Sequence, residues 1–146
     1  MKQPIIFDIE TDGFNPTKVH CLVLQKDGKE ISFVGRDIPK GIDLLADNLV
    51  VGHNVIKYDL PVLKRLYNYS HNPELVHDTL CLSRLIYPDI KQLDVKLLHS
   101  GKIRTHLVNK HNLESWGCRL DMLKGDFGKA NASWSSFSKE MLEYCI

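Results

Sequence analysis

Short runs of apolar residues, separated by glycine, proline and charged residues, mark the first half of the chain. Their length and composition predict β-strands over residues 4–8, 19–25, 30–34, 49–52 and 76–77. Lys26-Asp27-Gly28-Lys29, between the second and third runs, is typical of a hairpin connection. The chain therefore begins with a strand and a hairpin.

Apolar residues recur at helical spacing in several other segments. We predict a short helix introduced by Pro39 and Gly41, and helices over residues 57–69, 80–86, 113–120 and from Ser138 onwards. Pro61 is tolerated only in the first turn, which locates the start of the 57–69 helix. Asp78 or Thr79 is expected to cap the following helix. Residues 89–112 show no clear pattern, and residues 124–136 are expected to form a loop.

A hairpin attached to the first strand, followed by alternating helices and strands, predicts an α/β fold. Its central sheet should be mixed and flanked by helices. With neither a repeat nor a linker, residues 1–146 are expected to form one domain. Sites in open α/β sheets form at the carboxyl ends of strands, which is where the search for chemistry should begin.

The composition is that of an ordinary globular protein, with 43% hydrophobic and 25% charged residues and a net charge of +1. This charge argues against a bulk polyanion binder. No apolar stretch approaches the length of a membrane span, and no signal peptide begins the chain, so we expect no membrane association. Four dispersed cysteines without a C-x-x-C pair fit best with reduced thiols in a cytoplasmic protein, and their even number also allows disulfides.

Asp8 and Glu10 directly follow the apolar run Ile5-Ile6-Phe7. Side chains alternate in an extended strand, so these two carboxylates project from one face at its end. Crowded carboxylates either raise a pKa or bind a cation, and hard oxygen ligands suit Mg²⁺ or Mn²⁺. A strand end with one carboxylate capping a turn and the other solvated would explain the same pattern.

A second polar constellation runs from Gly52 to Asp59, again directly after a predicted strand. Gly52 allows close approach of the backbone, and Asn54 tolerates turn geometry while offering an amide. Asp59 falls in the first turn of a helix, where the helix dipole favours a carboxylate. Stabilisation of that helix terminus alone would also account for Asp59, with Tyr58 in the core.

Other catalytic signatures are absent from the sequence. The seven histidines lack cysteine pairs or H-x₃-H spacing, which makes a zinc site improbable on ligand pattern. No G-x-S-x-G, P-loop or G-x-G-x-x-G segment occurs. Serine hydrolases, P-loop NTPases and dinucleotide-binding enzymes are therefore disfavoured.

Together, F-D-I-E-T at residues 7–11 and N-x-x-x-Y-D at residues 54–59 resemble the first two motifs of the DEDD, DnaQ-like 3′–5′ exonucleases. The resemblance extends over nearly the whole chain to one branch, the proofreading domain of family A DNA polymerases from T-seven-like bacteriophages. The further matching segments occur in the expected order: Asp78-Thr79-Leu80, Ser83-Arg84-Leu85-Ile86, Leu97-Leu98, Ser100-Gly101-Lys102, Leu113-Glu114-Ser115-Trp116-Gly117, Arg119-Leu120 and Lys124-Gly125.

This resemblance implies a ribonuclease H-like fold and two-metal hydrolysis at single-stranded DNA 3′ ends, releasing nucleoside 5′-monophosphates. Asp8 and Glu10 would ligate the first divalent ion. Asp8 would also reach the second ion, which Asp59 would serve through water, with Mg²⁺ as the expected ion and Mn²⁺ as a substitute. Tyr144 corresponds to the position that orients the attacking water. The residues expected to contact the terminal nucleotides are Thr11, Phe14, Asn54 and Tyr58, although core packing would equally explain Phe14.

The chain departs from the pattern at the third motif, Y-x-x-x-D. The sequence ends at Tyr144-Cys145-Ile146, two residues before the expected aspartate, which would be a ligand of the first ion. We therefore expect weak metal binding and slow or absent cleavage by this chain alone. An alternative is a scaffold or DNA-end-binding half that a partner segment completes, such as a downstream polymerase polypeptide. A more distant option is an RNA-directed nuclease of the same superfamily, which would differ in its response to the 2′-hydroxyl. A phage-encoded chain would act in the cytoplasm of its bacterial host.

Overall fold

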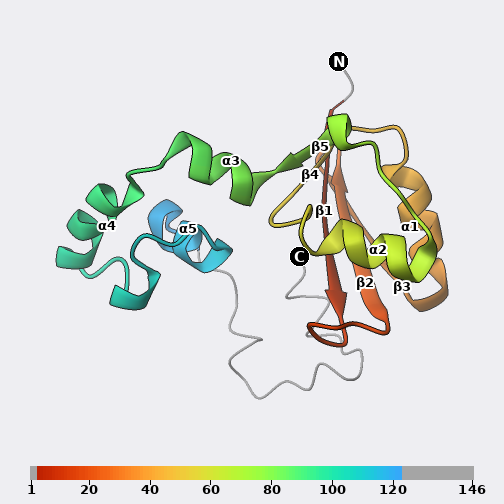
Figure 1. Ribbon diagram of the computed structural model, residues 1–146, viewed down its shortest axis with the longest axis horizontal. Helices are drawn as coiled ribbons and strands as arrows, with labels where there is room; N and C mark the ends of the chain where they lie inside the picture. The colour runs from red at the N-terminus through yellow and green to blue at the C-terminus, as the bar shows by residue number, and fades with distance from the viewer. Residues whose placement is uncertain (1–2, 123–146) are drawn as a thin grey trace. The chain divides into compact units, whose positions relative to one another are not determined.

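The computed structural model of the chain describes residues 3–122, and its elements are labelled in Figure 1. The described residues form two compact units, 3–78 and 79–122. The first unit contains all five strands of the described chain, and the second is helical. The expectation of one domain stays a prediction.

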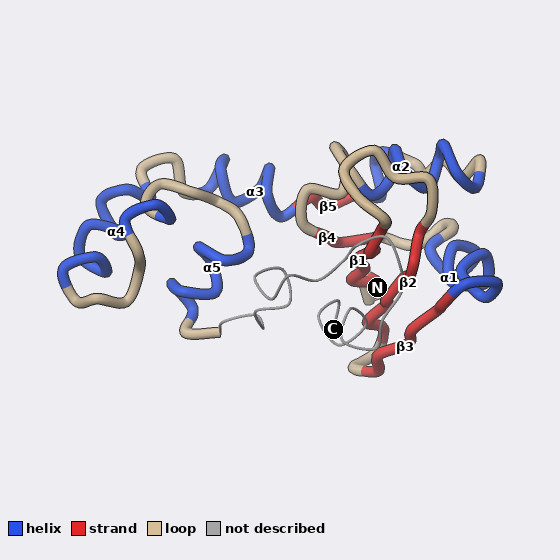
Figure 2. The backbone as a smooth tube through the Cα atoms, turned by 90° about the horizontal axis from the view of Figure 1, so that it is seen from below, coloured by secondary structure: helices blue, strands red, loops and turns tan. Residues whose placement is uncertain are grey.

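The first unit is built on a five-stranded mixed sheet in the order β3-β2-β1-β4-β5. Its strands are β1 (Ile5–Thr11), β2 (Val19–Lys26), β3 (Lys29–Val34), β4 (Val50–Gly52) and β5 (Val76–Asp78). β1, β2 and β3 pair antiparallel, whereas β4 and β5 extend the sheet in parallel from β1. All five predicted strands and the mixed sheet are confirmed, and Figure 2 shows the strands together.

The hairpin between β2 and β3 closes through Asp27 and Gly28, whose φ angles are 51° and 70°. Positive φ at both central residues is the geometry of a tight turn that matches the twist of the flanking strands. Glycine adopts this conformation without a steric cost, and aspartate tolerates it. The predicted connection is therefore confirmed.

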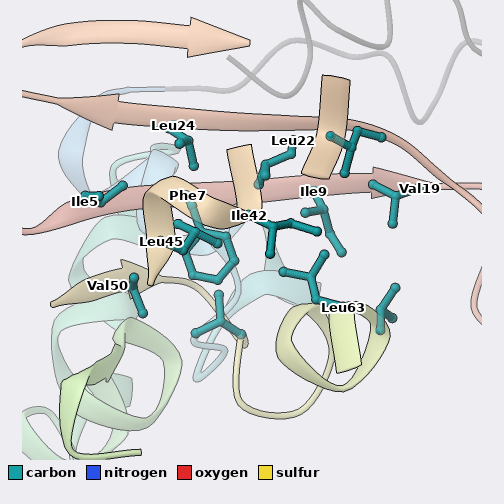
Figure 3. Packing of buried hydrophobic residues seen from close by; sticks show 13 residues of the cluster. Ile5, Phe7, Ile9, Val19, Leu22, Leu24, Ile42, Leu45, Val50 and Leu63 are labelled. Atoms are coloured by element: carbon teal, nitrogen blue, oxygen red, sulfur yellow. The ribbon is translucent and has the colours of Figure 1, made fainter. Parts of the chain in front are cut away.

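The core lies on one face of the sheet, under α1 (Ile38–Leu45) and α2 (Asp59–Tyr67) (Figure 3). On β1 every second residue points into it, namely Ile5, Phe7 and Ile9, each at most 4% exposed. Asp8 and Glu10 consequently face the other side of the sheet. β1 also extends to Thr11, beyond the predicted 4–8, because β2 continues to pair with it past Asp8.

The predicted 57–69 helix is confirmed as α2, which begins at Asp59 and holds Pro61 in its first turn. A short 3₁₀ turn, η1 (Gly35–Asp37), precedes α1, and another, η2 (Pro73–Leu75), precedes β5. Within residues 3–122, no helix combines the length and apolar character needed to cross a bilayer.

The second unit consists of α3 (Thr79–Ile86), α4 (Ile90–His99), the 3₁₀ turn η3 (Thr105–Leu107) and α5 (Leu113–Leu120). Sequence patterning missed α4, because its buried position 94 carries an aspartate instead of an apolar residue. Asp94 accepts hydrogen bonds at 2.8 and 2.7 Å from Nε and Nη2 of Arg119, on α5. This ion pair joins residues 25 positions apart, beyond the reach of local periodicity. The predicted loop at 124–136 and helix from Ser138 lie outside the described residues.

Gly52 at the end of β4 offers a stability test of this architecture. A Cβ at this position would lie 2.9 Å from the carbonyl oxygen of Phe7 and would overlap the buried side chain of Val55. Gly52→Ala should therefore lower the free energy of unfolding by about 1–3 kcal/mol, measured by urea denaturation. Gly28→Asn is the control, since Gly28 has open space and a φ that asparagine tolerates. Equal stability of the two variants would contradict the packing described.

Candidate active site

Asp8 and Glu10 lie side by side on the face of β1 opposite the core, as the alternation predicts. Their partners across the sheet are Val23 for Asp8 and Cys21 for Glu10. Both carboxylates are half-buried. β1 therefore holds two acids on one face, close to the carboxyl end of the strand.

Asp59 is joined to the same strand through the backbone of Ile9. β4 pairs with β1 only at Ile5 and Ile6, so β1 continues beyond its parallel neighbour. Past that point Oδ1 of Asp59 accepts a hydrogen bond from the Ile9 N–H at 3.3 Å. Asp59 is 3% exposed and is the first residue of α2. The start of α2 is thereby tied to β1 between Asp8 and Glu10.

Asp59 is buried and is subject to the negative charges of Asp8 and Glu10. Burial, the negative charge of Asp8 and, to a smaller extent, that of Glu10 raise the pKa of Asp59 to about 8. Hydrogen bonds from the backbone N–H groups of Asp59 and Ile9 offset this only in part. At neutral pH, and without a cation, the Asp59 carboxyl is therefore mainly protonated.

The donor chemistry of this trio fits a hard divalent cation. Carboxylate oxygens are the ligands that Mg²⁺ and Mn²⁺ prefer, and a positive charge would offset the repulsion that raises the Asp59 pKa. Among residues 3–122, however, no three His, Cys, Asp or Glu side chains are grouped as a ready metal site. Like charges disfavour such a cluster without a cation, and one Asp59 oxygen is engaged by Ile9.

The loop after β1 presents Phe14 to solvent. Asp12 organises this loop, because its Oδ1 accepts hydrogen bonds from the N–H groups of Thr17 and Lys18 at 2.8 and 3.1 Å. A further bond from the Thr17 hydroxyl to Oδ2, at 2.5 Å, contributes most to lowering the Asp12 pKa. Phe14 is 102% exposed, so the alternative that it packs in the core is wrong.

Arg65 on α2 and Tyr58, which directly precedes α2, also form hydrogen bonds with this loop. Nη1 of Arg65 donates to Oδ1 of Asn15 at 2.8 Å, and its Nη2 donates to the carbonyl of Pro16. The Tyr58 hydroxyl donates to the carbonyl of Gly13 at 2.7 Å. An exposed aromatic side chain thus lies on a loop with several fixed attachment points.

Thr11 and Tyr58, both predicted to contact a nucleotide, meet each other directly. Their hydroxyl oxygens are 2.6 Å apart, and the Thr11 hydroxyl oxygen lies 3.1 Å from the carbonyl oxygen of Gly13, so the two hydroxyls share this acceptor. Thr11 is buried, and Tyr58 packs against the core. These contacts support the loop that carries Phe14, while contact with a nucleotide stays a prediction.

Asn54, the fourth predicted contact residue, begins the turn between β4 and α2 with a φ of 66°. Its N–H donates to Asp78 Oδ1 at 2.9 Å. Sequence reasoning treated Asp78 as a helix cap and missed this contact with a segment 24 residues away. No local signal in the sequence reveals this contact, because it depends on the parallel pairing of β4 and β5, whose last residues Gly52 and Asp78 are register partners. Tyr144 lies outside the described residues.

The fold with its acidic strand end is a ribonuclease H-like α/β fold. A solved structure described as the apo form of a nuclease has the same fold, with a TM-score of 0.67 and 20% sequence identity. The similarity covers 99% of this chain and 65% of that one.

The sequence comparisons point to viral DNA polymerases. This chain is 33% identical to the DNA-directed DNA polymerase of Enterobacteria phage T3 and 32% identical to that of Escherichia phage T7, over 97% of its own length in each case. The predicted resemblance to T7-like phage DNA polymerases is thus confirmed. The chain spans about a quarter (24%) of the length of these relatives. No family model matches it.

The raised pKa of Asp59 predicts how the stability of the metal-free protein depends on pH. Between pH 4 and pH 8 the unfolded chain loses this proton while the folded chain keeps it, so stability should fall as pH rises. Each pKa unit corresponds to about 1.4 kcal/mol, so the loss of stability is about 6 kcal/mol at most. Asp59→Asn should remove this slope in chelator-treated protein and raise stability at pH 8.

Urea denaturation at several pH values measures this effect, with Asp43→Asn as the control. Asp43 is an exposed acid on α1, distant in sequence from the acidic trio. An Asp59→Asn protein that kept the wild-type pH slope would contradict the raised pKa.

Proposed function

We propose that this chain is the 3′–5′ exonuclease domain of a phage-type DNA polymerase. It would hydrolyse the last phosphodiester bond at a single-stranded DNA 3′ end and release a nucleoside 5′-monophosphate, using two divalent ions. The observation that carries this proposal is the approach of Asp59 to Asp8 and Glu10 at one end of the sheet. The similarity to T7-like phage polymerases along 97% of the chain supports it.

In this proposal Asp8, Glu10 and Asp59 hold the two ions, with Asp8 shared between them. When bound, the ions would activate water and stabilise charge on the phosphate oxygens. Asp59 would bind in its ionised form, which requires a nearby positive charge because burial otherwise favours the protonated carboxyl. The hydrogen bond from the backbone N–H of Ile9 would keep the side chain of Asp59 oriented toward β1.

The loop at residues 12–17 would hold the end of the DNA strand. Phe14 is an exposed aromatic ring, and stacking on such a ring tolerates any base. The bonds made by Asp12, Tyr58 and Arg65 restrict the movement of this loop. Less conformational freedom is then lost when a nucleotide binds. Thr11 and Asn54 flank this loop and the acidic trio, respectively, and would contact the terminal nucleotide.

The decisive experiment measures nucleotide release from 3′-labelled single-stranded DNA with Mg²⁺ or Mn²⁺. Asp8→Ala and Glu10→Ala should lower the rate by at least about 100-fold, since each removes a charged ligand of the proposed ions. A chelator should abolish release, and Asp43→Ala should retain it. Measurable release that is equal in the wild type and both acid variants would indicate a contaminating nuclease and remove the proposal.

A second candidate function is that of a catalytically incomplete protein, which binds DNA ends and needs another polypeptide to complete its metal site. It predicts no release by the chain alone and restored release when a polypeptide supplying the third-motif aspartate is added. No restoration, despite binding of that polypeptide, would contradict it.

The role of Phe14 gives a separate prediction. Phe14→Ala should weaken binding of a single-stranded DNA 3′ end by about 5- to 150-fold, the equivalent of 1–3 kcal/mol of stacking. Fluorescence anisotropy of a 5′-labelled oligonucleotide measures this change. The melting temperature should not change, because the ring is fully exposed. Phe14→Trp serves as the control and should retain binding, and an unchanged affinity of Phe14→Ala would rule out stacking.

A further inference from the structure

Asp78 places a second buried carboxylate beside the proposed site. It is 3% exposed and ends β5, next to the end of β4. Its Oδ1 accepts a hydrogen bond from the Asn54 N–H at 2.9 Å, and its Oδ2 accepts one from the Ile56 N–H at 3.1 Å. Both oxygens of one side chain therefore hold the segment that leads from β4 to α2.

The segment held by Asp78 is a tight turn. Asn54 has a φ of 66°, in the left-handed region that asparagine tolerates. The Asn54 carbonyl accepts bonds from the N–H groups of Lys57 and Tyr58, at 3.2 and 3.0 Å, which closes the turn. Val55 is fully buried and anchors the middle of the segment in the core.

This segment sets the position of two proposed site residues. Asn54 begins the turn, and Asp59 begins the helix directly after it. The Leu60 N–H donates a hydrogen bond to the Val55 carbonyl at 3.0 Å. This bond connects the turn directly to the first residues of α2. A shift at residues 54–56 would therefore move the start of α2, and with it the carboxyl of Asp59.

We propose that Asp78 is a positioning residue of the nuclease site, which fixes Asn54 and Asp59 through the backbone of residues 54–56. This inference rests on the proposed function. Asp78 would contact neither metal nor DNA. Its two hydrogen bonds would hold Asn54 in place for the nucleotide and Asp59 in place for the ion.

The proposal requires a carboxylate at position 78, because both partners are N–H donors. Asparagine has nearly the same shape but replaces one acceptor oxygen with an NH₂ group. Asp78→Asn would turn a donor toward either Asn54 or Ile56 and break one of the two bonds. The variant therefore tests the hydrogen bonds with little change in packing volume.

The test compares wild type, Asp78→Asn and Val76→Ala. Val76 lies on the same strand, is half-buried and packs against the core, so its truncation lowers stability without touching the carboxylate. Amide hydrogen exchange at Asn54 and Ile56 reports the positioning directly. Titrations with Mn²⁺, and with a 5′-labelled single-stranded oligonucleotide, report its effect on the site.

In Asp78→Asn we expect exchange at Asn54 or Ile56 to accelerate at least about tenfold, and Mn²⁺ affinity to fall about 10- to 100-fold. Val76→Ala should keep the wild-type Mn²⁺ affinity at a temperature where both variants are folded. Faster exchange with unchanged Mn²⁺ and DNA affinity would show a purely structural role and overturn the proposal. Failure of the wild type to bind Mn²⁺ or DNA would instead overturn the proposed function, and this inference with it.

Discussion

The hydrogen bond from the Ile9 N–H to Asp59 links the two halves of the candidate site. It exists because β4 ends at Gly52 while β1 continues to Thr11, which leaves a backbone donor beyond the last paired residue. A buried donor must be bonded, and the first side chain of α2 supplies the acceptor. The same bond that satisfies the backbone therefore brings a third acid beside Asp8 and Glu10.

This arrangement concentrates negative charge in a partly buried place. The repulsion and burial that raise the Asp59 pKa to about 8 lower the stability of the ionised, metal-free fold. A local loss of stability of this kind is typical of functional sites, where a bound ligand supplies the compensating positive charge. The large apolar core under α1 and α2 provides the stability that such a site requires.

Two loops at the carboxyl ends of β1 and β4 are fixed by aspartates of the fold. Asp12 closes the loop that carries Phe14, and Asp78 holds the turn that precedes Asp59. Each carboxylate binds two backbone N–H groups, so neither loop relies on packing alone. Loops held in this way can present functional side chains with little loss of entropy on binding.

Local sequence determined the strands, the hairpin at Asp27 and Gly28, and the shared face of Asp8 and Glu10, because each follows from short-range periodicity or turn chemistry. Only the tertiary structure decided what depends on residues distant in the chain. Asp94 can be buried in a helix only because Arg119 pairs with it. Asp78 reaches the turn after β4 only because β4 and β5 pair in parallel. Asp59 accepts the hydrogen bond from Ile9 only because β4 ends before that residue. The alternation within one strand is encoded locally, whereas the end of a neighbouring strand, and the unpaired backbone donor it leaves, exist only once the sheet has formed.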